Sequence, residues 1–363
     1  MKIGIDATFL NEKPTGVGVF TKEISERLSK LHRETLIFTS VPMNAPVRAT
    51  PLTLRGSTRR ADNVLRFIYT NTILPVAARK AGVDVLFCPI TEFPFVPQTS
   101  LVVTVHDFHQ LHFREQFGLA SRHFAFSMRL LRTIATRVLV PSQFVKRELL
   151  ARARLDAGSV DVVPEGYDSL LFKPRDASGC GAFFSRWGLG HPYILCVGSL
   201  FPYKNVETLV RSFEAVRHLI PHDLLIIGRK DVARRSLPGG DRVRYLGYID
   251  SEELPYFYSY TDLFVHPSLM EGFGITVLEA MACGAPVLSS SGGSLPEVVG
   301  QAGMFFDPLD GEALSRAIVE VLSSPSLRQE LREKGFMQAR KFSWDRAAAD
   351  VLASCETAAR TGR

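Results

Sequence analysis

The chain has 363 residues, of which 46% are hydrophobic and 22% are charged, and its formal net charge is +6. This length suits two domains with developed cores, and the composition is that of a soluble globular protein. No apolar run reaches the eighteen or so residues that a membrane span needs. The apolar start at residues 1–10 is too short for a signal peptide and predicts a strand.

The charge is unevenly distributed along the chain. Residues 1–175 hold 24 Lys and Arg against 15 Asp and Glu, a net charge of +9, and the remainder carries −3. The basic half is expected to meet an anionic membrane or a phosphate-bearing lipid, with a solvated basic face as the alternative. Nucleic acid is not expected, because no basic run is interleaved with aromatic residues. Five scattered cysteines lack the spacing of zinc or disulfide frameworks and indicate reduced thiols in a cytoplasmic protein.

Short apolar runs alternate with helical patterns, which predicts an α/β protein of two doubly wound domains with parallel sheets. Pro174 and Asp176 interrupt both periodicities, so the domains are expected at residues 1–176 and 177–343. Helical patterns lie, for example, at residues 21–31, 207–220 and 312–324. The expected strands cover residues 2–6, 35–40, 83–89, 101–107, 137–142, 160–166, 193–199, 223–229, 243–248, 263–268, 286–291 and 302–308.

Candidate ligand-binding residues follow several of these expected strands. In an open α/β sheet, ligands bind beyond the carboxyl ends of the strands, so these residues are expected to line one cleft. They are Gly16, Gly18, His106, Asp107, Ser199, Lys204 and Glu271. His109 and His112 follow closely on His106, but no carboxylate or cysteine set supports them. No metal site is therefore expected, and both are predicted to be loop or surface residues.

Residues 267–284 carry the most informative pattern in the chain. Glu271 and Glu279 are eight positions apart, and a turn bracketed by Gly272 and Gly274 separates them. The glycines let the backbone approach a ligand, and a helix that begins after the turn would direct its free N–H groups at a phosphate. The two carboxylates would repel that phosphate and are expected to accept hydrogen bonds from hydroxyl groups. A ligand with hydroxyl groups on both sides of a phosphate is a nucleotide sugar.

This segment resembles the E-x7-E motif of the retaining glycosyltransferases of family 4, which have the GT-B fold. The resemblance covers nearly the whole chain in the same order. It includes IGIDATFLNEKPTGVGVFTKEISERL at the start, VVTVHDF, VDVVPEGYD, YILCVGSLFPYKNVETLV, and VRYLGYIDSEELPYFYSYTDLFVHPS before the glutamates. It implies two Rossmann-like domains that face each other across a cleft, the first for the acceptor and the second for the donor. It also implies that a last helix, residues 344–363, crosses back to the first domain.

The resemblance implies a role for each candidate residue. Lys204 is expected to be the main counter-charge of the leaving diphosphate, because Ser199 and Tyr203 stand where many family members carry arginines. Glu271 is expected to hold the donor sugar, Glu279 to hold the ribose, and His106 to touch the transferred sugar. The catalytic set is thus His106, Lys204 and Glu271. The donor-binding set adds Gly16, Gly18, Ser199, Tyr248, Ile249, Gly272, Phe273, Gly274, Ile275 and Glu279.

The implied reaction moves a hexose from a nucleotide diphosphate sugar to a glycan or a polyprenyl-diphosphate-linked glycan. Configuration is retained, the leaving diphosphate serves as the base, and neither metal nor cofactor is expected. GDP-mannose is the favoured donor, with UDP-glucose or a UDP-hexosamine as the main alternative. A sugar-nucleotide epimerase of the same fold and a catalytically silent binding subunit are the competing functions.

Residues 121–137 predict an amphipathic basic helix. Arginines alternate there with Phe, Met and Leu residues, as in helices that lie on anionic membranes. A peripheral position on the inner face of the cytoplasmic membrane is therefore one expectation. A helix packed on its sheet, with solvated arginines, is the equal alternative.

Overall fold

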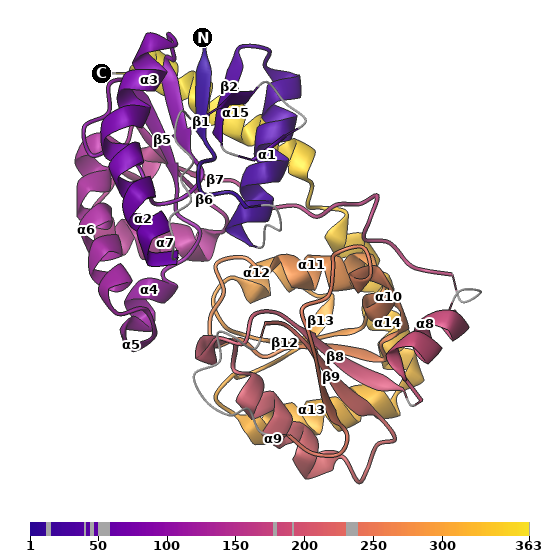
Figure 1. Ribbon diagram of the computed structural model, residues 1–363. Helices are drawn as coiled ribbons and strands as arrows, with labels where there is room; N and C mark the ends of the chain where they lie inside the picture. The colour runs from indigo at the N-terminus through magenta and orange to yellow at the C-terminus, as the bar shows by residue number, and fades with distance from the viewer. Residues whose placement is uncertain are drawn as a thin grey trace. The chain divides into compact units, whose positions relative to one another are not determined.

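The computed structural model describes residues 1–11, 16–39, 41–43, 47–49, 59–176, 180–190, 192–229 and 239–362. The chain folds into two compact units (Figure 1). The first unit comprises Met1–Glu165 with Trp344–Arg363, and the second comprises Gly166–Ser343. Each unit contains a parallel sheet with helices, so the predicted α/β class is confirmed.

In the part of the first unit that the structure describes, the sheet has seven strands in the order β3-β2-β1-β4-β5-β6-β7. Six of them match predicted strands. The exception is β3, whose three residues Val-Arg-Ala are too short and too polar for an apolar pattern. The strands are β1 (Ile3–Asp6), β2 (Thr35–Thr39), β3 (Val47–Ala49), β4 (Val85–Cys88), β5 (Ser100–Thr104), β6 (Arg137–Val140) and β7 (Val160–Val162).

The helices of the first unit bury apolar side chains against this sheet, including Leu74, Met128 and Leu149. They are α1 (Val17–Leu31), α2 (Arg59–Ile68), the π-helix η1 (Tyr69–Ile73), α3 (Leu74–Lys80), α4 (His109–His112), α5 (Arg114–Phe117), α6 (Leu119–Ile134), α7 (Gln143–Ala153), the 3-10 helix η2 (Ala157–Ser159) and α15 (Trp344–Thr361). Within the described ranges, no helix is both long and apolar enough to cross a bilayer.

Helix α15, yellow in Figure 1, lies against α1 and against the sheet of the first unit. Its buried residues recur every three or four positions, which places them on one face of the helix. They are Trp344, Ala347, Ala348, Val351, Ser354, Cys355 and Ala358. Polar bonds add to this contact, since Asp161 accepts hydrogen bonds from both Ser354 (2.6 Å) and Arg137 (2.7 Å).

Replacing Ser354 with alanine should lower the free energy of unfolding by about 1–3 kcal/mol, because the lost bond is made to a carboxylate in a partly buried setting. Urea denaturation of the full chain measures this change. Ser326→Ala is the matched control, since Ser326 is exposed and its hydroxyl group bonds to the Ser324 hydroxyl group at the surface. Equal stabilities of the two variants would contradict a stabilising role for the Asp161–Ser354 bond.

The sheet of the second unit has six described strands in the order β10-β9-β8-β11-β12-β13, all of which match predicted strands. They are β8 (Tyr193–Val197), β9 (Asp223–Ile227), β10 (Val243–Gly247), β11 (Leu263–His266), β12 (Val287–Ser290) and β13 (Gly303–Phe306). The helices are α8 (Cys180–Trp187), the 3-10 helix η4 (Pro202–Lys204), α9 (Val206–Val216), α10 (Leu254–Tyr260), α11 (Ile275–Ala282), α12 (Leu295–Val299), α13 (Gly311–Ser323) and α14 (Pro325–Ala339).

The predicted domain boundary near residue 176 is wrong, because the chain passes into the second unit after Glu165. Phe172 is buried in the core of the second unit, and Tyr167 and Leu171 pack against that core. Pro174 and Asp176, which interrupt the sequence pattern, lie inside the second unit. The second unit begins earlier in the chain because the side chains of Tyr167, Leu171 and Phe172 already pack in its core.

Both sheets change their direction of strand addition at one point, between β1 and β4 in the first unit and between β8 and β11 in the second. Loops that leave neighbouring strands in opposite directions open a crevice at such a switch point. The loops after β8 and β11 contain Lys204 and Glu271. The candidate site is therefore described from these two loops outward.

Candidate active site

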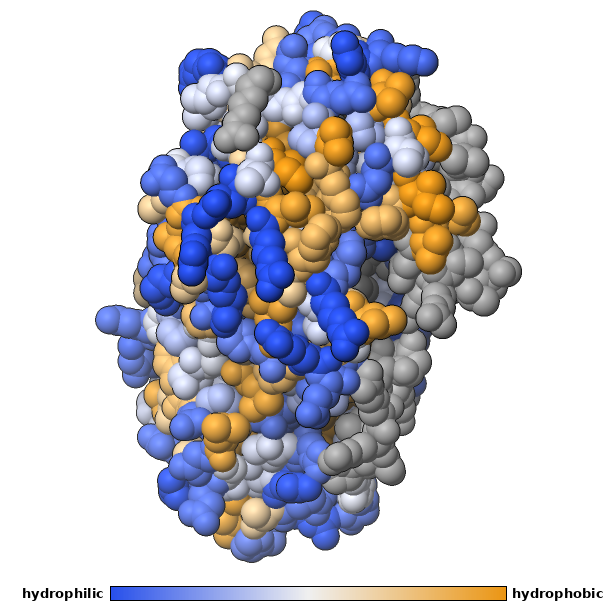
Figure 2. Space-filling model, turned by 90° about the vertical axis from the view of Figure 1, so that its left-hand side faces the viewer, coloured by the Kyte–Doolittle hydropathy of each residue, from blue (hydrophilic) through white to orange (hydrophobic). Residues whose placement is uncertain are grey.

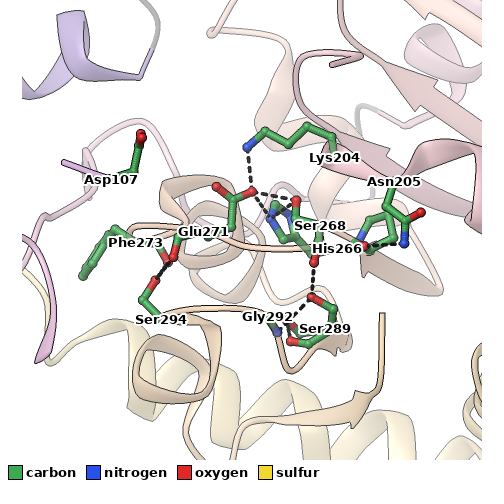
Figure 3. Close-up of polar contacts among 12 residues, drawn as sticks. Asp107, Lys204, Asn205, His266, Ser268, Glu271, Phe273, Ser289, Gly292 and Ser294 are labelled. Carbon is green, nitrogen blue, oxygen red and sulfur yellow. Dashed lines mark hydrogen bonds and ion pairs between the residues drawn. The ribbon is translucent and has the colours of Figure 1, made fainter. Parts of the chain in front are cut away.

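Glu271 is the centre of a buried polar network at the carboxyl edge of the second sheet (Figure 3). Its Oε1 atom accepts a hydrogen bond from Lys204 Nζ at 2.6 Å and from Ser268 Oγ at 2.6 Å. His266 Nε2 lies 2.9 Å from the same oxygen and donates to it, because a carboxylate can only accept. Three donors on one oxygen stabilise the ionised carboxylate and hold the Lys204 ammonium beside it.

Asn205 holds the loop of Lys204 against two neighbouring loops. Its backbone is left-handed, with φ of 57°, and its side-chain amide donates to the carbonyl groups of Pro267 (3.1 Å) and Pro308 (2.8 Å). Leu269 N also donates to Tyr203 O at 2.8 Å. The loops after β8, β11 and β13 are therefore joined directly around Lys204.

The loop of Glu271 rests on the loop that follows β12. Ser294 Oγ donates to the carbonyl groups of Glu271 (3.1 Å) and Phe273 (3.0 Å). A Cβ atom on Gly293 would lie 2.3 Å from the Glu271 carbonyl oxygen, so glycine is required there. Ser294 thus fixes the backbone of the glutamate loop.

Helix α11 begins at Ile275, where the sequence pattern predicts it. Gly274 precedes it with φ of 113°, a conformation that favours glycine. The first amide groups of a helix lack partners within it and carry a partial positive charge, so this end suits an anion. Gly272, Phe273 and Gly274 are the three residues directly before this N-terminus of α11.

Glu279 lies in the second turn of α11, half-buried among apolar residues. Burial raises the pKa of its carboxyl group to about 8, although Tyr258 Oη donates to Oε2 at 3.1 Å and acts in the opposite direction. Glu279 bonds to Tyr258, whereas Glu271 bonds to Lys204, Ser268 and His266, so the two carboxylates occupy separate environments.

Tyr248 and Ile249, two of the expected donor-binding residues, follow β10. Gly228 N donates to Gly247 O at 2.8 Å, which brings the ends of β9 and β10 together. Tyr248 is 40% exposed, and the Arg229 guanidinium lies 5.1 Å from the centre of its ring. Ile249 is buried, and Ser199 lies half-buried after β8.

Gly16 and Gly18 belong to the first unit and do not share one loop. Gly16 is the N-cap of α1 with φ of 53°, whereas Gly18 is buried in the first turn of that helix. The expectation of a glycine loop before the helix therefore holds for Gly16 and is wrong for Gly18. The start of α1 at Val17, one position after Gly16, explains the difference.

His106 is almost enclosed at the end of β5. Its Nε2 atom lies 2.8 Å from Pro89 O, and its Nδ1 atom lies 3.0 Å from Glu165 Oε1. Both partners are oxygen acceptors, an arrangement that favours the ring with protons on both nitrogens. Burial alone would lower the pKa of His106, but the hydrogen bond and the charge of Glu165 raise it above its ordinary value.

Replacing Glu165 with glutamine should lower the pKa of His106, because burial then acts without an opposing charge. The stability that the native pair contributes is complete below about pH 6.5, the unfolded pKa of histidine, and is lost as pH rises through the raised pKa. NMR titration of the imidazole protons measures both effects. His112, paired with Glu148 on the surface, is the internal control. An unchanged His106 titration would contradict the pairing.

His109 corrects another expectation, since it is buried rather than exposed. Its Nδ1 atom lies 3.1 Å from Asp107 Oδ2, and its backbone N–H donates to Asp107 Oδ1 at 2.9 Å. The pair closes the turn into α4. Among the described residues, no cluster of His, Cys, Asp or Glu suits a metal ion.

Comparison with known families places both halves of the chain. Residues 14–169 match the family described as Glycosyltransferase Family 4, and residues 183–338 match Glycosyl transferases group 1. The chain belongs to glycosyltransferase family 4.

Relatives of this family 4 chain include named mannosyltransferases. O-antigen chain mannosyltransferase B of Escherichia coli is 33% identical over 228 residues, which cover 60% of each chain. The GDP-mannose-dependent alpha-(1-6)-phosphatidylinositol monomannoside mannosyltransferase of Mycolicibacterium smegmatis is 31% identical over 196 residues. That match covers 49% of this chain and 51% of the relative. The chain thus spans about half to 60% of the length of these two relatives.

A solved structure shows the same fold. WaaG, a glycosyltransferase involved in lipopolysaccharide biosynthesis, superposes with a TM-score of 0.74 at 16% identity, covering 97% of this chain and 98% of WaaG. The predicted GT-B fold is confirmed. At this identity, the likeness supports the fold alone.

Sequence reasoning missed three side chains of this family 4 site: His266, Ser268 and Tyr258. His266 and Ser268 are two positions apart, a spacing that brings side chains to one side of an extended strand, and they lie five and three positions before Glu271. That spacing was the available signal. Tyr258 lies on α10, and nothing local in the sequence links it to Glu279.

Proposed function

We propose that this protein is a retaining hexosyltransferase that moves a sugar, with mannose favoured, from a nucleotide diphosphate sugar to a glycan. The observation that carries the proposal is the buried contact of Lys204 with Glu271, beside the N-terminus of α11. A cation and a helix N-terminus suit a diphosphate. A carboxylate with one oxygen held by three donors suits sugar hydroxyl groups.

In this proposal, Lys204 and the first amide groups of α11 stabilise the charge that develops on the leaving diphosphate. Glu271 holds hydroxyl groups of the donor sugar, and Glu279 holds the ribose. The leaving diphosphate takes the proton of the attacking hydroxyl group. Neither metal nor cofactor is proposed, because the lysine and the amides supply the positive charge that this step needs.

The two carboxylates are not proposed as a nucleophile and acid pair. Glycosidases that retain configuration place their two carboxyl groups about 5–5.5 Å apart around one bond. Here Glu271 bonds to Lys204, Ser268 and His266, whereas Glu279 bonds to Tyr258 on another helix. Because Glu271 and Glu279 have separate partners, we propose that they bind two different parts of the donor, the sugar and the ribose.

GDP-mannose is the proposed donor because the relatives above are named mannosyltransferases and one is named GDP-mannose-dependent. UDP-glucose and UDP-hexosamines are the competing donors. An epimerase would act on the donor without an acceptor. A silent subunit would bind the donor without turnover, but Lys204, Glu271 and Glu279 are all present.

We also propose that the first unit meets a lipid-linked acceptor at an anionic membrane on the cytoplasmic side. Helix α6 buries Phe124, Met128 and Leu131 and exposes Arg122 and Arg129. Figure 2 shows apolar surface next to hydrophilic side chains on the side of the molecule that bears α6. Co-sedimentation with phosphatidylglycerol vesicles tests this proposal. Binding equal to that of phosphatidylcholine vesicles would contradict it.

The decisive test of function combines binding with turnover. Thermal shifts with GDP-mannose, UDP-glucose and UDP-GlcNAc identify the donor, because a ligand of the folded state stabilises it by mass action. Incubation of that donor with mannose-terminated oligosaccharides should then yield a longer, α-linked product. A new free nucleotide sugar would instead favour the epimerase, and donor binding without turnover would favour the silent subunit.

A further inference from the structure

Tyr258 has a fixed position in the core of the second unit. It lies on α10 and is 0% exposed. Its ring packs edge-on against Phe264 of β11, with ring centres 5.5 Å apart, and against Phe172 at 6.2 Å. Because close-packed neighbours hold the ring on two sides, its hydroxyl group has a defined position.

The hydroxyl group of Tyr258 bonds to one oxygen atom of Glu279. Its Oη atom donates to Glu279 Oε2 at 3.1 Å, which joins α10 to α11. Burial raises the pKa of the Tyr258 hydroxyl group well above its ordinary value, so the group keeps its proton and remains a donor. Glu279 Oε2 is therefore occupied by a partner from within the protein.

The other carboxyl oxygen of Glu279 is available to a ligand. The residue is half-buried, and within the part of the chain that the structure describes its Oε1 atom has no hydrogen-bond partner. Oε1 is also not one of the enclosed, unpaired side-chain atoms of that part, so solvent reaches it. The two oxygen atoms thus differ, because Oε2 bonds to the protein and Oε1 is accessible.

The carboxyl group of Glu279 depends on Tyr258 for its orientation. The last torsion of a glutamate side chain is broad, so an unsupported carboxyl group rotates. The neighbours of Glu279 on α11 are the buried apolar residues Val277, Leu278 and Ala280, whose side chains offer no hydrogen bond. Immobilising a flexible side chain when a ligand binds weakens affinity, and a partner that immobilises it beforehand removes this loss.

We infer that Tyr258 is a positioning residue for the ribose of a nucleotide. The inference rests on the proposed function, in which Glu279 holds the ribose. Tyr258 fixes Glu279 Oε2, so that Oε1 forms the hydrogen bond to the ribose hydroxyl groups. Tyr258 is buried and acts on the nucleotide only through Glu279. Selection of a ribonucleotide over an analogue without these hydroxyl groups therefore depends on Tyr258.

Isothermal titration of the full chain with GDP and with 2′,3′-dideoxy-GDP tests this inference. UDP and its dideoxy analogue serve instead if UDP is the ribonucleotide that the wild type binds. Tyr258→Phe keeps the ring contacts and removes the hydroxyl group. It should weaken binding of the ribonucleotide by about threefold to tenfold and leave binding of the dideoxy analogue unchanged. The preference for the ribonucleotide should fall by the same factor.

Tyr193→Phe is the matched control. Tyr193 is 1% exposed, and its Oη atom donates to the backbone carbonyl group of Phe257 on α10 at 2.9 Å. This variant also removes a buried hydroxyl bond to α10 but leaves the Tyr258–Glu279 bond in place, so it should keep the wild-type preference. If Tyr258→Phe kept the preference as Tyr193→Phe does, or weakened both nucleotides equally, the inference would be overturned.

Glu279→Ala provides a second test, because the effect of Tyr258 must pass through Glu279. In this background, Tyr258→Phe should not weaken ribonucleotide binding further, since two residues that act through one interaction are not additive. Additive losses would overturn the inference and leave the proposed function intact. A wild type that binds neither GDP nor UDP would overturn the proposed function, and the inference with it.

Discussion

Lys204→Met should lower kcat/KM for the donor by about 100- to 1,000-fold, the usual cost of removing one group that stabilises developing charge. Methionine keeps much of the length of lysine and removes its ammonium group. Glu271 would keep its bonds to Ser268 and His266, so the fold should survive. Steady-state kinetics with varied donor, and circular dichroism for the fold, measure the two effects.

A surface pair provides the matched control for Lys204→Met. Lys334 Nζ also lies 2.6 Å from a glutamate oxygen, that of Glu330, but this pair is exposed on α14. Exposed pairs of this spacing contribute only about 0.3–0.5 kcal/mol. Lys334→Met should therefore have wild-type kinetics. If the Lys204 variant were as active as the Lys334 variant, Lys204 would have no role at the diphosphate.

Glu279→Ala should raise the dissociation constant of the donor by about 10- to 100-fold, because hydrogen bonds to the ribose are lost. Glu279→Gln keeps an oxygen that can accept from Tyr258 and from a hydroxyl group, so its loss should be much smaller. Isothermal titration with GDP-mannose or UDP-glucose measures both. Equal affinities in the alanine variant and the wild type would remove Glu279 from the donor site.

Glu279 should also make stability depend on pH. Its folded pKa of about 8 lies above the unfolded value of 4.5, so the folded state binds the proton more tightly. The free energy of unfolding therefore falls as pH rises from about 4.5 to about 8, and is constant outside this window as far as Glu279 is concerned. Glu279→Gln should remove this part of the pH dependence in urea denaturation. A slope that is unchanged in the variant would show that Glu279 ionises in the native state as it does in the unfolded chain.

The fold was largely predictable because strand and helix periodicities are local properties of the sequence. The six strands that the structure describes in the second unit follow from apolar runs, and α11 begins where its glycine turn predicts. Strand β3 was not predicted, because three residues with a central arginine show no alternation of apolar and polar side chains that would indicate a strand. His109 was misjudged as exposed because its burial depends on how α4 packs, which no neighbouring residue reports.

The candidate site likewise contains residues that the sequence predicts and partners that it does not. Lys204, Glu271 and Glu279 were predicted from residue type and from their place after strands or in a helix, since parallel strands bring their carboxyl ends to one edge. Their partners were not predicted. Asn205 bonds to the carbonyl groups of Pro267 and Pro308, 62 and 103 positions away, and such pairings exist only once the sheet has formed.

The amino-acid pattern alone establishes two α/β domains, their strands and a ligand site of glycines, lysine and glutamates, because each depends on residues near one another in the chain. Folding establishes which oxygen of Glu271 receives three donors and that Glu279 bonds to Tyr258. These features depend on side chains from separate elements. Distance and burial, which arise only when those elements pack, control hydrogen bonding and proton affinity.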